Sequence, residues 1–265
     1  MSSTLPKQNS VAPTAPSPPG PVLTTPPPGR AVLTGETALV TGASRGIGRA
    51  TARQLGQLGA SVAICARNRQ ELERTAAALH DEGINTLPIV ADVTRAADVQ
   101  RLVEQTCGEL GEIGILVNNA GIGIFGLFHE RSESEWDAVL GTNLKAVFLI
   151  SRAVTPGMVR LGRGHIINIS SLASKSAFSG GAIYCASKWG LMGLTGCMAE
   201  ELRAHGIRVS IVCPGSVATE FSPHSGRNPA TLLQPDDVAH AVAMVVTQSA
   251  QSFISEVDVR PLQKA

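Results

Sequence analysis

The sequence predicts one α/β domain in which a parallel β-sheet carries helices on both faces. Along most of the chain, short apolar stretches typical of strands alternate with amphipathic stretches of helical period. A chain of 265 residues that is 43% hydrophobic can bury one substantial core of this kind. The strands are expected at residues 37–41, 61–66, 86–90, 115–118, 165–170, 207–213 and 256–260.

The first expected strand, 37–41, leads into a glycine-rich turn, and a helical pattern follows that turn. The turn reads Thr41-Gly42-Ala43-Ser44-Arg45-Gly46-Ile47-Gly48. Glycines let the backbone approach a phosphate, and free N–H groups at the start of a helix attract its negative charge. The turn is therefore a candidate cradle for a dinucleotide pyrophosphate, although a glycine cluster alone is as often an ordinary turn.

Capping signals mark two helices further along the chain. Asn68 with Glu71 and Ser132 with Glu135 each have the spacing of a capping box, which begins a helix. Pro88 lies inside the third expected strand and cannot donate a hydrogen bond to a neighbouring strand. That strand is therefore expected at an edge of the sheet.

The most informative side chains are Tyr184 and Lys188, with Ser171 upstream of them. Residues four apart on a helix share one face, so the ammonium is expected beside the phenol. A neighbouring cation stabilises a phenolate, so Lys188 is expected to lower the pKa of Tyr184 from about 10 toward the range of acid–base catalysis. A lone pair of this kind is more often an ordinary helical pair, so the catalytic interpretation depends on the other motifs.

Taken together, these motifs resemble the classical short-chain dehydrogenase/reductase family, from about Gly35 to about Pro261. The resemblance implies a single Rossmann-like domain whose seven-stranded parallel sheet has the order 3-2-1-4-5-6-7. The chain is closest in style to NADP-dependent carbonyl reductases and 3-oxoacyl-thioester reductases. The motifs occur in family order: the turn at 41–48, Asp92-Val93, Asn118-Asn119-Ala120-Gly121, Asn143, Ser171, Tyr184 with Lys188, and Pro214-Gly215.

The resemblance also implies catalytic roles for residues at the carboxyl edge of the sheet, where ligands bind in such folds. Tyr184 is expected to donate a proton to a carbonyl oxygen, and Ser171, rather than the adjacent Ser170, to hydrogen-bond that oxygen. Lys188 is expected to bind the nicotinamide ribose as well. Asn143 matches the family residue that holds a water between the lysine and solvent, although an Asn in a helix can equally bond its own backbone.

The end of the second expected strand favours NADPH over NADH. NAD-preferring relatives carry an acidic residue there, whereas this chain has Ala66 followed by Arg67, whose guanidinium can bind a 2′-phosphate. Arg45 matches a second basic position of NADP-dependent relatives, and either arginine alone could be a solvated charge. The expected cofactor-binding residues are Gly42, Ser44, Arg45, Gly46, Ile47, Gly48, Arg67, Asn68, Asp92, Val93, Asn119, Ala120, Gly121, Tyr184, Lys188, Pro214, Gly215, Val217 and Thr219.

Composition disfavours several other classes of protein. A formal net charge of +1 gives no electrostatic basis for binding nucleic acid, and no apolar run is expected to cross a membrane. The five cysteines have scattered spacing, which is typical of free thiols in a reducing compartment and indicates a cytoplasmic location. The six histidines show no metal-ligand spacing, so no metal site is expected. Family resemblance implies a homo-oligomer, either a dimer or a tetramer.

Residues 1–34 are expected to form a disordered tail ahead of the domain, which spans 35–265. Nine of the 16 prolines fall in the first 30 residues, and such a segment cannot bury enough apolar surface to offset its ordering entropy. A neutral extension is the favoured interpretation. A transit peptide and a proline-rich docking ligand are minority alternatives.

The substrate is expected to be a ketone, an aldehyde, a hydroxy acid or a 3-oxoacyl thioester. The ending at 255–261 departs from the glycine-rich ending of dedicated fatty-acid-synthesis reductases. A non-catalytic NADP-binding regulatory or scaffold protein is the alternative, but such proteins often lose the Tyr or the Lys that this chain keeps. Apolar candidates for the pocket wall are Ile122, Ile124, Phe125, Phe178, Ile183 and Phe221.

Overall fold

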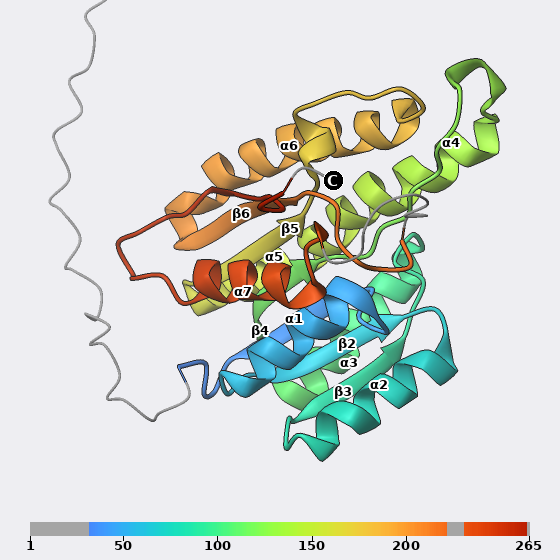
Figure 1. Ribbon diagram of the computed structural model, residues 1–265. Coiled ribbons are helices and arrows are strands. Elements are labelled where there is room, and N and C mark those ends of the chain that lie inside the picture. Colours follow the sequence, from blue (N-terminus) through green and yellow to red (C-terminus); the bar gives the residue numbers. More distant parts are fainter. Residues whose placement is uncertain (1–31, 222–230, 264–265) are drawn as a thin grey trace, which may run out of the picture.

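The computed structural model describes residues 32–221 and 231–263. Its described residues form a seven-stranded parallel sheet in the order β3-β2-β1-β4-β5-β6-β7, as predicted (Figure 1). The strands are β1 (Thr37–Thr41), β2 (Ser61–Ala66), β3 (Thr86–Val90), β4 (Ile113–Asn118), β5 (Gly164–Ile169), β6 (Ile207–Pro214) and β7 (Glu256–Val259). The α-helices are α1 (Gly46–Gln57), α2 (Arg69–Asp81), α3 (Ala96–Leu110), α4 (Glu133–Leu140), α5 (Ala146–Leu161), α6 (Ala182–Leu202) and α7 (Pro235–Val246).

Helices cover both faces of the sheet because successive strand residues point to opposite sides. Ala38 and Val40 of β1 lie in one buried core with residues of α1, α2 and α7. Leu39, between them, lies in a second core with residues of α3, α5 and α6. Strands that are buried on both faces read as continuous apolar runs, which is why β1 and β2 were recognisable from sequence.

The predicted strands agree with the structure except at their ends. β4 begins at Ile113, two residues early, because its pairing with β1 shifts register between Thr37 and Ala38 and passes over Gly114. A Cβ at Gly114 would lie 2.3 Å from a carboxylate oxygen of Glu36, so a larger residue there would displace that side chain. β5 begins and ends one residue earlier than predicted, β6 ends one residue later, and β7 ends one residue earlier. Pro88 lies in the edge strand β3, as predicted.

The two predicted capping boxes differ in the structure. At the start of α4, Ser132 and Glu135 make both reciprocal hydrogen bonds of a capping box. At the start of α2, the Asn68 side chain accepts a hydrogen bond from the Glu71 N–H at 3.2 Å. The Glu71 carboxylate instead accepts a hydrogen bond from Ser44 Oγ at 3.3 Å, which connects α2 to the glycine-rich turn. The predicted second half of that box is therefore replaced by a tertiary contact.

The predicted tail lies outside the described residues except for its last three positions. Leu33 is 6% exposed, belongs to the core under α1, and donates its N–H to the Leu58 carbonyl at 2.8 Å. Packed structure therefore begins before the predicted boundary at residue 35.

One continuous helical segment among the described residues, Glu133–Leu161, is long and apolar enough to cross a membrane by length and composition alone. Sequence analysis missed it because α4, the π-helical turn η2 (Gly141–Lys145) and α5 join end to end. Ile150, Val154 and Met158 of α5 are buried against the sheet. A core helix of a globular domain has these same properties.

Candidate active site

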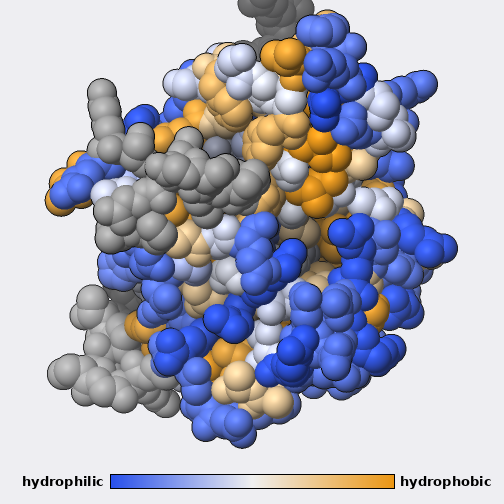
Figure 2. Space-filling model, turned by 45° about the vertical axis from the view of Figure 1, so that its right-hand side comes forward, coloured by the Kyte–Doolittle hydropathy of each residue, from blue (hydrophilic) through white to orange (hydrophobic). Residues whose placement is uncertain are grey.

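A large cleft, of about 1550 Å³, lies at the carboxyl ends of the strands. Figure 2 turns the right-hand side of Figure 1 forward, and hydrophobic residues gather over the upper half of that face and hydrophilic residues over the lower half. Gly48 and Asn143 lie outside the wall of the cleft. The predicted site residues that line it are Gly42, Ser44, Arg45, Gly46, Ile47, Arg67, Asn68, Asp92, Val93, Asn119, Ala120, Gly121, Ser171, Tyr184, Lys188, Pro214, Gly215, Val217 and Thr219.

The glycine-rich turn has the geometry of a phosphate cradle. Gly42 and Gly46 have φ angles of +63° and +55°, a left-handed conformation that favours glycine. No side chain caps the N-terminus of α1 within the described chain, and its first turn holds no acidic residue. The N–H groups at this helix start are therefore available to an anion in the cleft.

Gly48 supports the turn from outside the cleft. A Cβ at Gly48 would lie 2.4 Å from the Gly42 carbonyl oxygen and 2.5 Å from Asn119 Nδ2. That Nδ2 donates hydrogen bonds to the carbonyls of Thr41 and Gly42 at 2.9 and 3.1 Å. The glycine thus lets α1 pack directly against the turn, while Asn119 ties the turn to the end of β4.

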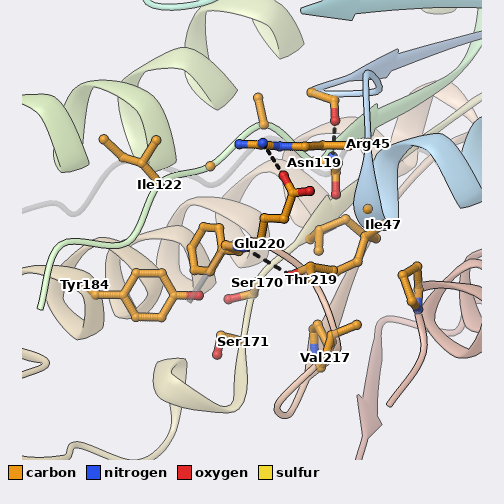
Figure 3. A pocket seen from close by; sticks show the side chains of 18 of the residues that line it. Arg45, Ile47, Asn119, Ile122, Ser170, Ser171, Tyr184, Val217, Thr219 and Glu220 are labelled. Atoms are coloured by element: carbon orange, nitrogen blue, oxygen red, sulfur yellow. Dashed lines mark hydrogen bonds and ion pairs between the residues drawn. The ribbon is translucent and has the colours of Figure 1, made fainter. Parts of the chain in front are cut away.

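Ser171, Tyr184 and Lys188 meet at the other end of the cleft. Ser171 follows β5, and Tyr184 and Lys188 lie one turn apart on α6, where they are 8% and 5% exposed. Figure 3 shows the Tyr184 hydroxyl directed toward the two serines at the end of β5, Ser170 and Ser171. Lys188 Nζ donates a hydrogen bond to the Ile169 carbonyl at 2.9 Å.

The predicted lowering of the Tyr184 pKa by Lys188 is wrong. Burial raises the pKa of Tyr184 to about 12, and a hydrogen bond with Ser171 offsets only part of that rise. The Lys188 ammonium lies 5.8 Å from the centre of the phenol ring, and burial lowers the pKa of Lys188 to about 8. Tyr184 therefore carries its proton at neutral pH, which is the state that a proton donor needs.

Asn143 holds two neighbouring elements in place. It lies in η2 rather than in a regular α-helix, and it is 1% exposed. Its Oδ1 accepts a hydrogen bond from the Ile122 N–H, and its Nδ2 donates to the Ile122 carbonyl and to Ser187 Oγ at 2.9 and 3.1 Å. Asn143 thus joins the loop after β4 to the helix that carries Tyr184. Its predicted water-holding role stays a prediction.

The two arginines expected at the cofactor phosphate have different surroundings. Arg67 is exposed on the cleft wall and makes no ion pair with any residue that the structure describes. Arg45 forms an ion pair with Glu220, which follows β6 and reaches across the cleft in Figure 3. Sequence reasoning missed Glu220, because only the fold brings it to the glycine-rich turn.

Asp92 and Val93 lie at the end of β3, as the family pattern predicts. The Asp92 carboxylate accepts hydrogen bonds from the N–H and hydroxyl of Thr94 at 3.0 and 2.7 Å. On the opposite wall, Gly215 donates its N–H to the Val259 carbonyl at 2.8 Å, which fixes the start of the segment after β6. Asp92 is therefore held by local hydrogen bonds, and the start of the segment after β6 by a hydrogen bond to β7.

Ser170, to which the sequence pattern gave no catalytic role, also faces the cleft. Its hydroxyl is buried, with the residue 4% exposed, and it has no hydrogen-bond partner within the described chain. A buried hydroxyl without a partner is costly unless a ligand or water satisfies it. Together with the open N-terminus of α1, it shows that the cleft fits a polar, anionic ligand such as a dinucleotide.

The predicted apolar wall is only partly correct. Ile122, Phe125, Phe178 and Phe221 line the cleft, whereas Ile124 does not, and Ile183 is a core residue that is 4% exposed. All five cysteines are free, and the described residues include no group of three or more metal-binding side chains that could hold an ion.

The family model for short chain dehydrogenases matches residues 36–230. The chain belongs to the short-chain dehydrogenase family. The resemblance inferred from the motifs is thereby confirmed, as is the Rossmann-like fold.

Curated relatives within this family include reductases. Dehydrogenase/reductase SDR family member 4 of Oryctolagus cuniculus is 41% identical over 191 residues, which cover 72% of this chain and 74% of that protein. The 3-oxoacyl-(acyl-carrier-protein) reductase of Synechocystis sp. is 36% identical over 231 residues, which cover 84% of this chain and 94% of that protein.

Solved structures similar to this chain include an oxidoreductase and a ketoreductase. A metagenomic short-chain oxidoreductase in complex with NADP is 45% identical, with a TM-score of 0.78 over 88% of this chain and 100% of that one. A variant of the actinorhodin polyketide ketoreductase with NADPH is 33% identical, with a TM-score of 0.81 over 85% of this chain and 96% of that one.

Proposed function

We propose that this protein is an NADPH-dependent reductase that converts a carbonyl group to an alcohol. The observation that carries the proposal is the meeting of Ser171, Tyr184 and Lys188 in the same cleft as the glycine-rich turn. Its membership of an oxidoreductase family and the reductases among its relatives support this activity. The reverse reaction, alcohol oxidation, uses the same groups.

The bound dinucleotide supplies the hydride, and the residues of this chain control the proton. The Ser171 and Tyr184 hydroxyls would both hydrogen-bond the carbonyl oxygen, where negative charge develops. Because burial keeps Tyr184 protonated at neutral pH, its hydroxyl can donate a proton to that oxygen. Lys188 would bind the nicotinamide ribose.

NADPH is the proposed form of the cofactor. The NADP and NADPH complexes among the similar structures support it, as does the absence of an acidic residue at the end of β2. Arg67 and Arg45 would hold the 2′-phosphate, since guanidinium groups bind phosphate in bidentate geometry. The N-terminus of α1 would hold the pyrophosphate.

Substituting the proton donor tests the proposal. Tyr184 is the only tyrosine of the chain, so Tyr184→Phe removes one phenolic hydroxyl and no similar group. Turnover with NADPH and a panel of ketones, aldehydes and 3-oxoacyl thioesters should fall about a hundredfold to ten-thousandfold, with the NADPH Kd unchanged. Ser171→Ala should behave similarly, whereas Lys188→Ala should also weaken NADPH binding.

Two results would contradict the proposal. Near-normal kcat in Tyr184→Phe would exclude this residue as the proton donor. Tight NADPH binding by the wild type without turnover of any carbonyl in the panel would favour the regulatory or scaffold alternative.

We also propose a cytoplasmic homo-oligomer. The free state of all five cysteines supports a reducing compartment. Four large apolar side chains on the surface of α4, α5 and α6 support self-association, since they would be covered in a dimer or tetramer. They are Trp136, Phe148, Val159 and Trp189.

A further inference from the structure

Aromatic rings are concentrated around the catalytic phenol. The chain has only six phenylalanines, and three of them form a connected group with Tyr184. The Phe125 ring lies 5.4 Å from the Tyr184 ring in an edge-to-face arrangement, and the Phe221 ring lies 5.8 Å from it. Phe178 extends the group, with its ring 6.1 Å from that of Phe125.

These rings come from three segments that are distant in sequence. Phe125 follows β4, Phe178 precedes α6, and Phe221 lies after β6. All three line the cleft at its catalytic end. The fold therefore builds an aromatic wall there from independent loops.

Two of these rings remain open to the cleft. Phe178 and Phe221 are 49% and 40% exposed, whereas Tyr184 is 8% exposed. Large apolar faces are normally covered, and an exposed pair inside a cleft marks a surface that a ligand can cover. Offset-stacked and edge-to-face pairs give aromatic ligands an advantage over aliphatic ligands of the same size.

The charges of the cleft lie elsewhere. Arg45, Arg49 and Arg67 belong to its cofactor-phosphate end. Near the catalytic end, Lys188 is bonded to a backbone carbonyl and Arg260 forms an ion pair with Asp258. Both of these cations therefore already have a partner among the described residues, Lys188 in a hydrogen bond and Arg260 in an ion pair. A neutral substrate fits this environment best.

We propose that the substrate is a neutral ketone with an aromatic ring within one carbon of the carbonyl group. The inference rests on the proposed reductase function. The ring packs on the exposed faces of Phe178 and Phe221, and the carbonyl oxygen meets Tyr184 and Ser171. The carbonyl carbon gains a hydride from NADPH and the oxygen gains the Tyr184 proton, giving a secondary alcohol and NADP⁺; solvent then returns a proton to Tyr184.

A matched pair of ketones tests this inference. 1-Phenylpropan-2-one and 1-cyclohexylpropan-2-one have the same carbonyl environment and differ in the aromaticity of the ring. We expect the wild type to have the higher kcat/KM for the phenyl ketone. In Phe178→Leu and Phe221→Leu, the phenyl-to-cyclohexyl ratio of kcat/KM should fall about two- to tenfold, because leucine keeps the apolar contact and loses the ring.

Phe128→Leu is the matched control, because Phe128 is 77% exposed and does not line the cleft. The phenyl-to-cyclohexyl ratio of kcat/KM in this variant should equal that of the wild type. An unchanged NADPH Kd in every variant verifies the fold. Equal kcat/KM for both ketones, or a ratio that Phe178→Leu and Phe221→Leu leave unchanged, would overturn the aromatic-substrate inference alone. A wild type that binds NADPH and reduces no carbonyl would overturn the proposed function and this inference together.

Discussion

Arg45 has two candidate partners that carry negative charge. In the structure its guanidinium pairs with the Glu220 carboxylate, and in the proposed function it binds the 2′-phosphate of NADPH. The side chains of this ion pair are 60% and 73% exposed, so the pair itself contributes little stability. Glu220 can therefore be displaced, but it still opposes the phosphate through competition and like charge.

Substitution of Glu220 should consequently tighten NADPH binding. We expect Glu220→Gln to lower the NADPH Kd about two- to fivefold, the range of an exposed ion pair, and to leave the NADH Kd unchanged. Arg45→Ala and Arg67→Ala should each raise the NADPH Kd about tenfold to a hundredfold. Fluorescence titration of both cofactors provides these constants.

A double variant tests whether Glu220 weakens NADPH binding by pairing with Arg45. In the Arg45→Ala background, Glu220→Gln should have a smaller effect on the NADPH Kd than in the wild type. An equal effect in both backgrounds would mean that Glu220 does not compete for this guanidinium. Equal or tighter binding of NADH by the wild type would contradict the assignment of NADPH.

At the scale of single residues, the sequence predicts which side chains form the candidate site better than it predicts their pKa values and ion pairs. Ser171, Tyr184 and Lys188 follow from order and spacing, and the structure brings them to one end of the cleft. The pKa of Tyr184 does not follow, because it depends chiefly on burial, which local spacing does not reveal. The pairing of Arg45 with Glu220 joins residues 175 positions apart, and no local pattern indicates it.

At the scale of elements, α1 depends on its close approach to the glycine-rich turn. We expect Gly48→Ala to lower the free energy of unfolding by about 1–3 kcal/mol and to weaken NADPH binding, because backbone atoms of Gly42 and Ala43 occupy the space of a Cβ. Gly108→Ala is the matched control. It lies in α3 with no atom near its Cβ position, so the substitution should raise stability by about 0.5–1 kcal/mol. Urea unfolding measures both free energies. A free energy of unfolding that falls in both variants, or rises in both, would contradict the prediction.

The pairing of β5 with β6 includes a buried histidine whose tautomer can be assigned. The Ser210 hydroxyl donates its proton to the Ile254 carbonyl at 2.6 Å, so it must accept from His165 Nε2, which lies 2.8 Å away. His165 Nδ1 is then an unprotonated, buried nitrogen without a partner in the described chain. Burial, with a smaller contribution from Arg208, lowers the pKa of His165 from 6.5 to about 3.

This histidine should make the fold sensitive to acid. Between pH 6.5 and about 3 the unfolded chain binds a proton at His165 and the folded chain does not, so the free energy of unfolding falls as the pH falls. The contribution of one such group is about 1.4 kcal/mol per pH unit. Urea unfolding at several pH values should show a shallower dependence for His165→Gln. The exposed His205 provides the control, since His205→Gln should keep the wild-type slope.

Element positions were predictable where the pattern is local. β1, β2 and β3 have the predicted bounds, because each is a short apolar run between turn signals. β4 was predicted two residues short because Gly114 interrupts its apolar run, and only pairing with β1 extends the strand past it. Only one of the two hydrogen bonds of the predicted capping box at Asn68 is present, because the Glu71 carboxylate makes a tertiary contact with Ser44 that the sequence does not indicate.

At the scale of the whole molecule, topology explains why distant motifs meet. Once a parallel sheet is predicted, residues that follow its strands must share one edge, and this explains why the glycine-rich turn and Ser171, Tyr184 and Lys188 line the same cleft. The lining of that cleft is less predictable. Ile183 and Phe178 are both apolar and lie near α6, yet one is a core residue and the other faces the cleft.

The prediction of an oligomer rests on the surface formed by α4, α5 and α6. Phe148 of α5 is 45% exposed, and together with Leu144, Gly190 and Leu194 it lines a shallow hollow formed by α4, η2, α5 and α6. The exposed Trp189 also belongs to α6. Apolar groups on adjacent helices are typical of an interface between identical subunits, because in a twofold interface the same surface patch of each subunit meets the other.

We therefore expect light scattering to show a dimer or tetramer for the wild type and a smaller species for Phe148→Glu, because a charge in the centre of the interface is desolvated without a partner. Phe128→Glu changes an exposed ring outside this surface and should keep the wild-type mass. A monomeric wild type would contradict the proposal of an oligomer. An oligomer that Phe148→Glu leaves intact, with Trp189→Glu equally without effect, would place the interface on another face of the molecule.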